Sequence, residues 1–437
     1  MLKKIMRIAG KIQQTLSSAD NMLWIWAVIA VSGLLLFYLL TGIPGRGTTL
    51  VFSQWWEDEL EAGVLEKLVK DFEEEHPGIT VRLEKKSRQE IRAALSGTDD
   101  QARGKKKRQN ADIFSVEGGW ADDAEYGLAP LDALDQALPE KKASNAPRDF
   151  LPPDFAAGTE ARALPVISLI NPLFYNIEML QSAGFDRPPK NRTEFLSYVQ
   201  AITKPDQGVY GAVLALGEEN PLGISRHILS WIWSAGGREG DSFDFGSRQV
   251  VESLVFLNQL KPYLYPGFFG LDEEDRLKIF AEEKAGMMIG SVSDVRNLRD
   301  QMKQNFNITT IPSPALYVGK PVFALSSWYV GISAESTNRE EAAEFIGFLL
   351  ERTSELAAGA FAVPGSGARN ADLVNTDPYY SKAYDMYDAG EMVRELYGTG
   401  RTEKLNAVIY EELKRMFDGQ SPEDTAAAIQ SRWENIL

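Results

Sequence analysis

Apolar runs alternate with amphipathic helical stripes along most of the chain, starting at residue 48. Thr48 to Gln54 (TTLVFSQ) has the pattern of a short buried strand. A helix is then predicted from Asp58, which has Glu61 three residues later in capping-box spacing, to the Pro77-Gly78 stop. The residues that follow, from Ile79 to Leu83, alternate apolar and polar positions as in a half-buried strand. This order predicts a strand–helix–strand unit, the repeating element of α/β proteins.

The same alternation continues to the C-terminus. Residues 113–116 and 164–176 have the pattern of buried strands, and residues 225–235 that of a tryptophan-rich helix. Two helices are predicted at the end. The first stops at Gly419, and the second begins after Ser421, which offers a capping hydroxyl followed by proline. The pattern therefore predicts an α/β fold without internal repeats.

The N-terminal segment has a different composition. No charged side chain occurs from Asn21 to Gly45, and residues 23–43 read LWIWAVIAVSGLLLFYLLTGI. At about 1.5 Å per residue this run spans a hydrocarbon core of about 30 Å. Lysines and arginines precede it, which places the N-terminus in the cytoplasm.

A cleaved signal peptide is the alternative interpretation of this segment. Its apolar region would be shorter, about 7–15 residues, and would end at small residues. Here the run ends at Thr41-Gly42-Ile43-Pro44, which lacks such a site. We therefore predict a transmembrane anchor within residues 1–47. The remainder of the chain would lie on the extracytoplasmic side, in the periplasm or at the cell surface.

The overall charge narrows the range of partners. The chain has 46 Lys and Arg against 62 Asp and Glu, a net charge of −16. Such a chain does not attract phosphate backbones, so no nucleic-acid partner is expected. The basic run at residues 105–108 has no aromatic residue within it and is interpreted as a solvated loop.

Cysteine is absent and there are only two histidines, His76 and His227. Disulfides, thiolate metal sites, cysteine nucleophiles and a multi-histidine zinc centre are therefore excluded. We expect neither a metal ion nor a cofactor.

Tryptophans occur where predicted strands end. Open α/β sheets place ligands at such strand ends, and aromatic rings can bury the apolar faces of a ligand. The candidate platform residues are Trp55, Trp56, Trp120, Trp231 and Trp328. For each of them, packing in a core is the alternative. Trp231 and Trp233 are two apart on a helix, so at most one of them should face a cleft.

Two acidic residues, Glu57 and Glu117, also follow predicted strands and could accept hydrogen bonds from hydroxyl groups. Two carboxylates at a cleft could instead form a glycosidase pair. The sequence has no G-x-S-x-G motif, no glycine-rich phosphate loop and no histidine-based dyad. We therefore predict binding without catalysis.

The order of these segments resembles the extracellular solute-binding proteins of family 1, the sugar-type receptors of ATP-binding-cassette importers. LPVISLINPLFYNIEMLQSAGFDRPPKNRTEFL resembles the family signature, a strand ending in Tyr-Asn followed by a leucine-rich helix. The other matching segments are LVFSQWWEDELEAGVLEKLVKDFEEEHPGITVRLE, NADIFSVEGGWADDAEYGLAPLDAL, FAEEKAGMMIGSVSDV and GKPVFALSSWYVGISAESTNREEAAEFIGFLL. The chain departs from the family in lacking a lipid-anchoring cysteine, and in having Ile167 and Pro172 where small or polar residues are preferred.

The resemblance implies a two-lobed periplasmic-binding-protein-like fold of type II, with a hinge between the lobes. Lobe 1 is expected to comprise residues 48–162 and 324–362, and lobe 2 residues 163–323 and 363–437. A carbohydrate or similar polyhydroxylated solute would bind between them, and permease subunits would be the partners. The further ligand-binding residues that the resemblance suggests are Asn171, Tyr175, Ser291, Ser293, Tyr329 and Arg369. Arg369 could instead be an ordinary loop arginine that does not contact the ligand.

A membrane-tethered sensor that presents the bound solute to a signalling partner remains an alternative to import. The sequence does not distinguish these roles, and it leaves open the identity of the solute, the oligomeric state and the permease.

Overall fold

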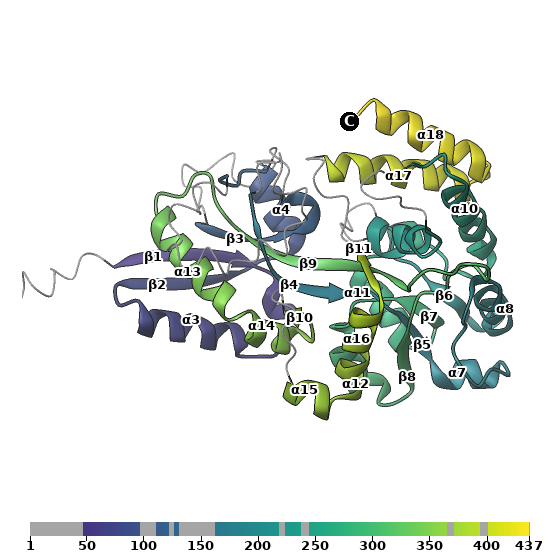
Figure 1. Cartoon of the computed structure of the whole chain (residues 1–437), viewed down its shortest axis with the longest axis horizontal. Coiled ribbons are helices and arrows are strands. Elements are labelled where there is room, and N and C mark those ends of the chain that lie inside the picture. The colour runs from purple at the N-terminus through teal and green to yellow at the C-terminus, as the bar shows by residue number, and fades with distance from the viewer. Residues whose placement is uncertain are drawn as a thin grey trace, which may run out of the picture. The chain divides into compact units, whose positions relative to one another are not determined.

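The computed structural model describes residues 47–96, 111–121, 126–130, 162–217, 223–236, 244–364, 371–393 and 401–436 (Figure 1). No helix in these ranges is both long enough and apolar enough to cross a membrane. The predicted span at residues 23–43, the basic run at 105–108 and Arg369 lie outside the described residues. The anchor therefore stays a prediction.

The chain forms two compact units. The smaller comprises residues 1–49 and 73–80, and the larger residues 50–72 and 81–437. In the smaller unit, the backbone N–H of Thr48 donates to the carbonyl of Gly78 (2.9 Å), and the hydroxyls of Thr49 and Thr80 are 3.1 Å apart. The larger unit contains the elements that concern function.

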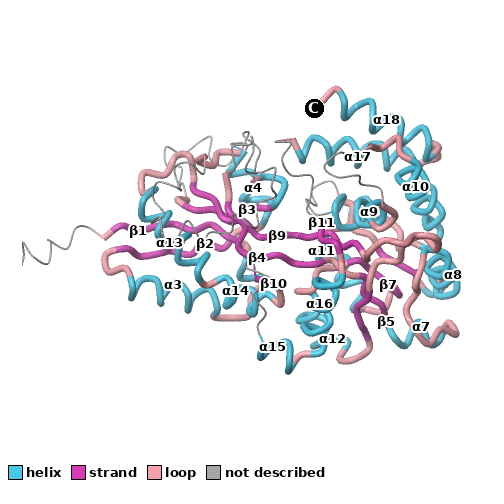
Figure 2. The backbone as a smooth tube through the Cα atoms, viewed as in Figure 1, coloured by secondary structure: helices cyan, strands magenta, loops and turns pink. Residues whose placement is uncertain are grey.

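The first sheet has the strand order β10-β4-β9-β3-β1-β2, with β11 paired to β9. β1 and β3 are parallel, whereas β9 is antiparallel to both β3 and β4. The strands are the magenta segments in Figure 2. Parallel pairing brings the carboxyl ends of β1 and β3 to the same edge. The strands are β1 (Thr48–Gln54), β2 (Ile79–Lys85), β3 (Ile113–Glu117), β4 (Leu164–Ile170), β9 (Val322–Ile332), β10 (Val363–Pro364) and β11 (Glu391–Val393).

The second sheet has the order β6-β7-β5-β8. The strands are β5 (Leu173–Asn176), β6 (Tyr210–Val213), β7 (Ala285–Ile289) and β8 (Phe306–Thr309). The single strand predicted for residues 164–176 is therefore two strands in two sheets, divided at Asn171-Pro172. Proline has no backbone N–H to donate to a ladder, which explains the break at this point.

Helices pack against both sheets. α13 and α14 contact strands of the first sheet, whereas α8 and α11 contact strands of the second (Figure 1). The helices are α3 (Val64–Glu75), α4 (Arg88–Ser96), α7 (Ile177–Ser182), α8 (Arg192–Ile202), α9 (Ser230–Trp233), α10 (Arg248–Leu260), α11 (Glu273–Ala281), α12 (Asp294–Met302), α13 (Arg339–Glu351), α14 (Thr353–Ala360), α15 (Ala371–Thr376), α16 (Pro378–Ala389), α17 (Thr402–Phe417) and α18 (Pro422–Glu434).

The predicted helix start at Asp58 is wrong. A 3₁₀ turn covers Trp56–Asp58, and α3 begins only at Val64. Gly63 between them has a φ of 85°, a left-handed conformation that interrupts a right-handed helix.

The predicted start of the last helix after Ser421 is confirmed. The Ser421 hydroxyl accepts from the backbone N–H of Asp424 (3.0 Å), and α18 begins at Pro422.

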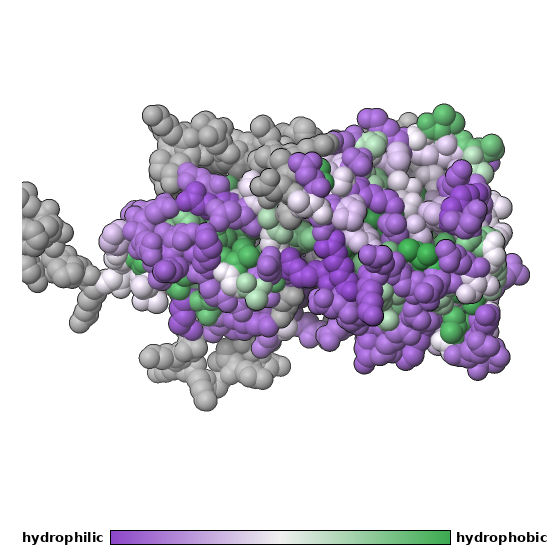
Figure 3. Space-filling model, turned by 90° about the horizontal axis from the view of Figure 1, so that it is seen from below, coloured by the Kyte–Doolittle hydropathy of each residue, from purple (hydrophilic) through white to green (hydrophobic). Residues whose placement is uncertain are grey.

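The face of the protein shown in Figure 3 is mainly hydrophilic. In Figure 3, hydrophobic residues form only small areas among hydrophilic ones on the face shown. Leu316 and Val318 are the large hydrophobic side chains that stand exposed in the described ranges. Binding of a small solute is therefore best sought among enclosed side chains.

Candidate ligand-binding site

Four tryptophans gather where strands of the first sheet end. Trp55 follows β1, Trp120 lies in the 3₁₀ turn Gly118–Trp120 after β3, and Trp328 belongs to β9. The rings of Trp56 and Trp328 stack with centroids 5.3 Å apart, and the Trp120 ring meets that of Trp55 edge-on at 6.2 Å. All four side chains are at most 2% exposed. We call these four residues the first-sheet tryptophan cluster.

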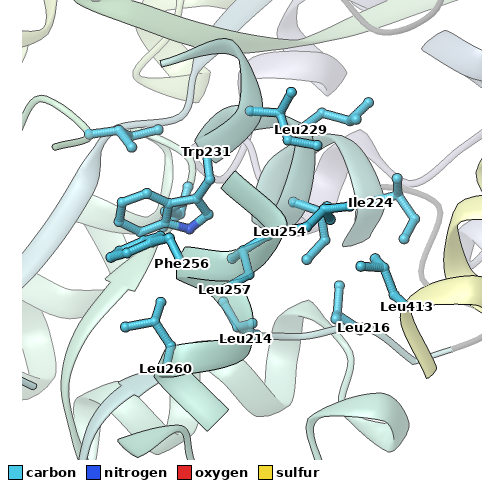
Figure 4. Close-up of a cluster of buried hydrophobic side chains, with 14 of the residues drawn as sticks. Leu214, Leu216, Ile224, Leu229, Trp231, Leu254, Phe256, Leu257, Leu260 and Leu413 are labelled. Carbon is cyan, nitrogen blue, oxygen red and sulfur yellow. The ribbon is translucent and has the colours of Figure 1, made fainter. Parts of the chain in front are cut away.

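Trp231 does not join them. It lies on α9 in the hydrophobic core of the second sheet, where its ring centroid is 4.9 Å from that of Phe195 and 5.1 Å from that of Phe256. Figure 4 shows Trp231 beside Phe256. Trp233 belongs to the same core. Of the candidate platform residues, Trp231 is therefore placed in a core, because its ring packs against the aromatic side chains of α8 and α10.

An arginine between two carboxylates borders the first-sheet tryptophan cluster. Arg88 donates through Nε to Glu117 and through a terminal nitrogen to Glu59. Its guanidinium lies 4.8 Å from the ring centre of Trp55. Burial raises the pKa of Glu117, and the positive charge of Arg88 opposes that rise. Glu117 is thus ion-paired within the protein.

The second predicted carboxylate is placed differently. Glu57 is half-buried in the 3₁₀ turn, where its backbone N–H donates to the side-chain oxygen of Gln54 (3.1 Å). Glu57 and Glu117 therefore differ in burial and in partners. Their arrangement gives no support to a matched pair of catalytic acids.

Asn171 lies where the chain passes from the first sheet to the second. Its side-chain nitrogen donates to the carbonyl of Ala324 (2.9 Å) and to the Ser326 hydroxyl (3.0 Å). Its side-chain oxygen accepts from Nε of Arg226 (3.0 Å). Every hydrogen-bonding group of this amide has a protein partner, so Asn171 ties the end of β4 to β9.

A buried ionic network continues from Arg226. Glu273 accepts from Arg226, from Nε of Arg276 (2.9 Å) and from His227 (3.1 Å). Arg276 also donates to Asp294 (2.8 Å). Burial alone would raise the pKa of Glu273, but the charges of Arg226 and Arg276 outweigh it and hold that pKa well below its ordinary value. Burial lowers the pKa of His227.

The remaining predicted residues belong to strands of both sheets or follow them. Ser291 and Ser293 follow β7, and the hydroxyl of Ser293 donates to that of Ser291 (2.8 Å). Tyr175 is buried in the core of the second sheet. Tyr329 is buried in β9 opposite Val116. Ser291 lies beside Asn171, because the backbone N–H groups of its neighbours Gly290 and Val292 donate to the carbonyls of Pro172 (3.2 Å) and Ile170 (3.1 Å), whereas Tyr175 and Tyr329 belong to different sheets.

Residues that the sequence analysis did not single out connect the C-terminal helices to the first-sheet tryptophan cluster. Glu403, in the first turn of α17, accepts from Nε1 of Trp120 (2.6 Å), from Arg92 of α4 (2.9 Å) and from the Tyr126 hydroxyl. A pocket of about 150 Å³ adjoins it. The pocket is lined by Arg92, Leu216, Gly217, Gly223, Ile224, Glu403, Asn406, Ala407, Tyr410 and Glu411. No motif in the sequence marks these positions.

A family model for bacterial extracellular solute-binding proteins matches residues 57–355. The chain belongs to this family. The match includes Trp120 and Trp328 of the first-sheet tryptophan cluster and the Arg226–Glu273 network, whereas Trp55 and Trp56 lie just before its first residue. It ends before α17, so Glu403 and the other α17 residues that line the adjoining pocket lie outside the matched segment.

Individual relatives of this solute-binding protein are distant. A Deinococcus radiodurans protein named as a probable ABC transporter-binding protein is 23% identical over 248 residues, covering 53% of this chain and 58% of that protein. The chain therefore matches little more than half the length of that relative.

Two solved structures share the fold. An ABC transporter solute-binding protein from Thermotoga lettingae, bound with α-D-tagatose, has a TM-score of 0.70 at 19% identity and covers 89% of this chain and 99% of its own. Maltose-bound MalE3 of T. maritima has a TM-score of 0.70 at 18% identity, and the match covers 89% of this chain and 100% of that chain. The predicted two-lobed α/β fold is thereby confirmed for this solute-binding protein.

Proposed function

We propose that the chain is the extracytoplasmic solute receptor of an ATP-binding-cassette importer and binds a carbohydrate or similar polyhydroxylated solute between two lobes. The observation that carries this proposal is the first-sheet tryptophan cluster beside Arg88, Glu59 and Glu117. Aromatic rings suit the apolar faces of a sugar, and charged groups suit its hydroxyls. The indole N–H groups of Trp55, Trp56 and Trp328 are buried and have no partner among the described residues, so they are available as donors.

Lobe closure is part of the proposal, and two contacts support it. Arg296 of α12, in predicted lobe 2, donates to the backbone carbonyls of Glu59 (3.1 Å) and Gly359 in predicted lobe 1. Glu403 joins the lobes in the same way through Arg92. A solute that contacts both lobes would favour the closed form by its differential affinity for that form.

Binding of the full-length protein to D-tagatose, ribitol and maltose, measured by calorimetry and thermal unfolding, tests this function. A solute at 100 times its dissociation constant should stabilise the fold by about 2.7 kcal/mol, and it should be recovered unchanged. Absence of binding to carbohydrates and polyols, or turnover of a bound glycoside, would contradict the proposal.

The proposal includes an anchor formed by residues 23–43, which would keep the receptor beside its permease. Full-length protein should remain in the membrane fraction after salt and carbonate washing, because the apolar run is long enough to span. A mature N-terminus near Gly45, found by mass spectrometry, would show that the segment is cleaved.

A further inference from the structure

The pocket between α4 and α17 has the chemistry of a binding site. Among its lining residues, Arg92 offers donors, whereas Glu403 and Glu411 offer acceptors. The side-chain oxygen of Asn406 is buried and has no hydrogen-bond partner in the described part of the chain. Tyr410 adds an aromatic ring to the wall. A buried acceptor without a partner is costly, and a hydroxyl group entering the pocket would satisfy it.

The charges around the pocket are already balanced. Arg92 pairs with Glu403 (2.9 Å), and Glu411 pairs with Arg432 of α18 (2.7 Å). A charged solute would leave one charge without a counterion in a partly enclosed space, which is unfavourable. A neutral solute with several hydroxyls meets no such penalty.

The size of the pocket limits what fits. Its volume of about 150 Å³ equals that of an engineered protein cavity that holds benzene. One six-membered ring or a short polyol is therefore the expected occupant, rather than a long oligosaccharide.

Glu403 connects this pocket to the first-sheet tryptophan cluster. One carboxylate oxygen accepts from Trp120 (2.6 Å), and the other accepts from Arg92 (2.9 Å), which lines the pocket. A solute that hydrogen-bonds Glu403 would thus sit between α17 and residues of the first sheet.

We infer that the pocket beside Asn406 and Glu403 is a binding subsite for one neutral, hydroxyl-bearing ring or short polyol. The solute donates a hydroxyl hydrogen to Oδ1 of Asn406 and another to the Glu403 carboxylate, and Arg92 donates to a solute oxygen. This inference rests on the proposed receptor function, and it assigns a place and a size class to the solute.

Calorimetric titration of the full-length protein with D-tagatose and ribitol tests the subsite. Ala407→Phe places a large side chain in the pocket from an exposed helical position and should weaken binding by at least about tenfold, since it removes both contacts and space. Lys414→Phe adds the same side chain at an exposed position of the same helix outside the pocket lining and should bind like the wild type. Asn406→Leu removes the acceptor at similar size and should weaken binding about five- to tenfold.

The outcomes separate the two proposals. If the wild type binds a probe, and Ala407→Phe and Asn406→Leu both bind that probe as tightly as the wild type does, the subsite is refuted while the receptor function stands. If neither these probes nor maltose binds the wild type, the proposed solute class fails, and the subsite fails with it. Tighter binding of D-glucuronate or D-glucosamine than of the neutral probes would overturn the assignment of a neutral solute. Should Ala407→Phe fail to fold, as judged by its melting curve, Asn406→Leu decides.

Discussion

The first-sheet tryptophan cluster and the core around Trp231 are equally buried, but their charged neighbours differ. Beside Trp231, the buried Arg192 donates to neutral groups, among them the hydroxyl of Ser253 (3.0 Å), and burial lowers the pKa of Arg192 to about 10. Beside Trp55, Arg88 donates to two carboxylates.

This difference teaches that burial alone does not identify a ligand platform. Neutral serine and carbonyl partners fix Arg192 as part of a core. Carboxylates at the edge of a sheet can instead exchange a protein donor for a solute hydroxyl, since both satisfy the same oxygens. The partners of the neighbouring arginine are therefore the better guide to function.

Trp231→Ala should give the largest effect. It removes a fully packed core side chain, so we expect a loss of about 3–5 kcal/mol in the free energy of unfolding. Solute affinity of the molecules that stay folded should be nearly unchanged. Denaturant unfolding and calorimetry measure the two quantities. A loss of solute affinity with an unchanged free energy of unfolding would instead show that Trp231 belongs to the binding surface and not to a core.

Glu273→Gln should lower the free energy of unfolding by about 3 kcal/mol, because Arg226 and Arg276 are left without the carboxylate that they share. The pKa of Glu273 is lowered in the folded state, so its stabilising contribution is present above the unfolded pKa near 4.5 and is lost as the pH falls toward the folded value.

Unfolding curves at several pH values test this sign. The wild type should lose stability on acidification below about pH 4.5, and part of that slope should be missing in Glu273→Gln. An identical slope in both proteins would show that Glu273 is not the titrating group. Glu252→Gln, at an exposed carboxylate of α10, is the matched control.

Trp328→Ala should mainly affect solute binding, with a loss of about 1.5–3 kcal/mol in affinity, or roughly 10- to 150-fold. Trp328 is also buried, so some stability will be lost as well, and affinity must be measured on folded protein. Trp328→Phe keeps an aromatic face and should bind better than Trp328→Ala. If both variants bind like the wild type, the cluster is only a second core.

Ser421→Ala should give the smallest effect, a loss of about 1 kcal/mol in the free energy of unfolding, because it removes only the hydroxyl that caps α18. Its solute affinity should equal that of the wild type. It sets the baseline against which loss of affinity through general destabilisation is judged.

The pattern of the sequence predicted the elements better than the contacts between them. Trp55 and Trp120 come together because each follows one of two parallel strands, a relation that strand order alone suggests. For Trp231, helical spacing showed that Trp231 and Trp233 face different ways, but not which element each would face.

Local sequence patterns could not predict hydrogen bonds between residues that are far apart in the chain. The Glu403–Trp120 bond joins residues 283 positions apart, and no motif precedes Glu403. The helix start at Asp58 was mispredicted because the capping-box spacing was satisfied locally, whereas Gly63 adopts a left-handed conformation that the spacing does not reveal. The lobe boundaries stay predictions.

The bonds of Asn171 have a mechanical consequence. Its backbone N–H and its side chain both bond to the carbonyl of Ala324 (3.1 and 2.9 Å), so two strands distant in sequence are joined laterally beside the passage between the sheets. Because β4 and β9 are bonded side by side, each strand resists rotation of the other about its own axis, whereas both strands can still bend together. Relative motion of the two sheets should therefore be dominated by one bending coordinate, and rotation about the strand axis should be suppressed.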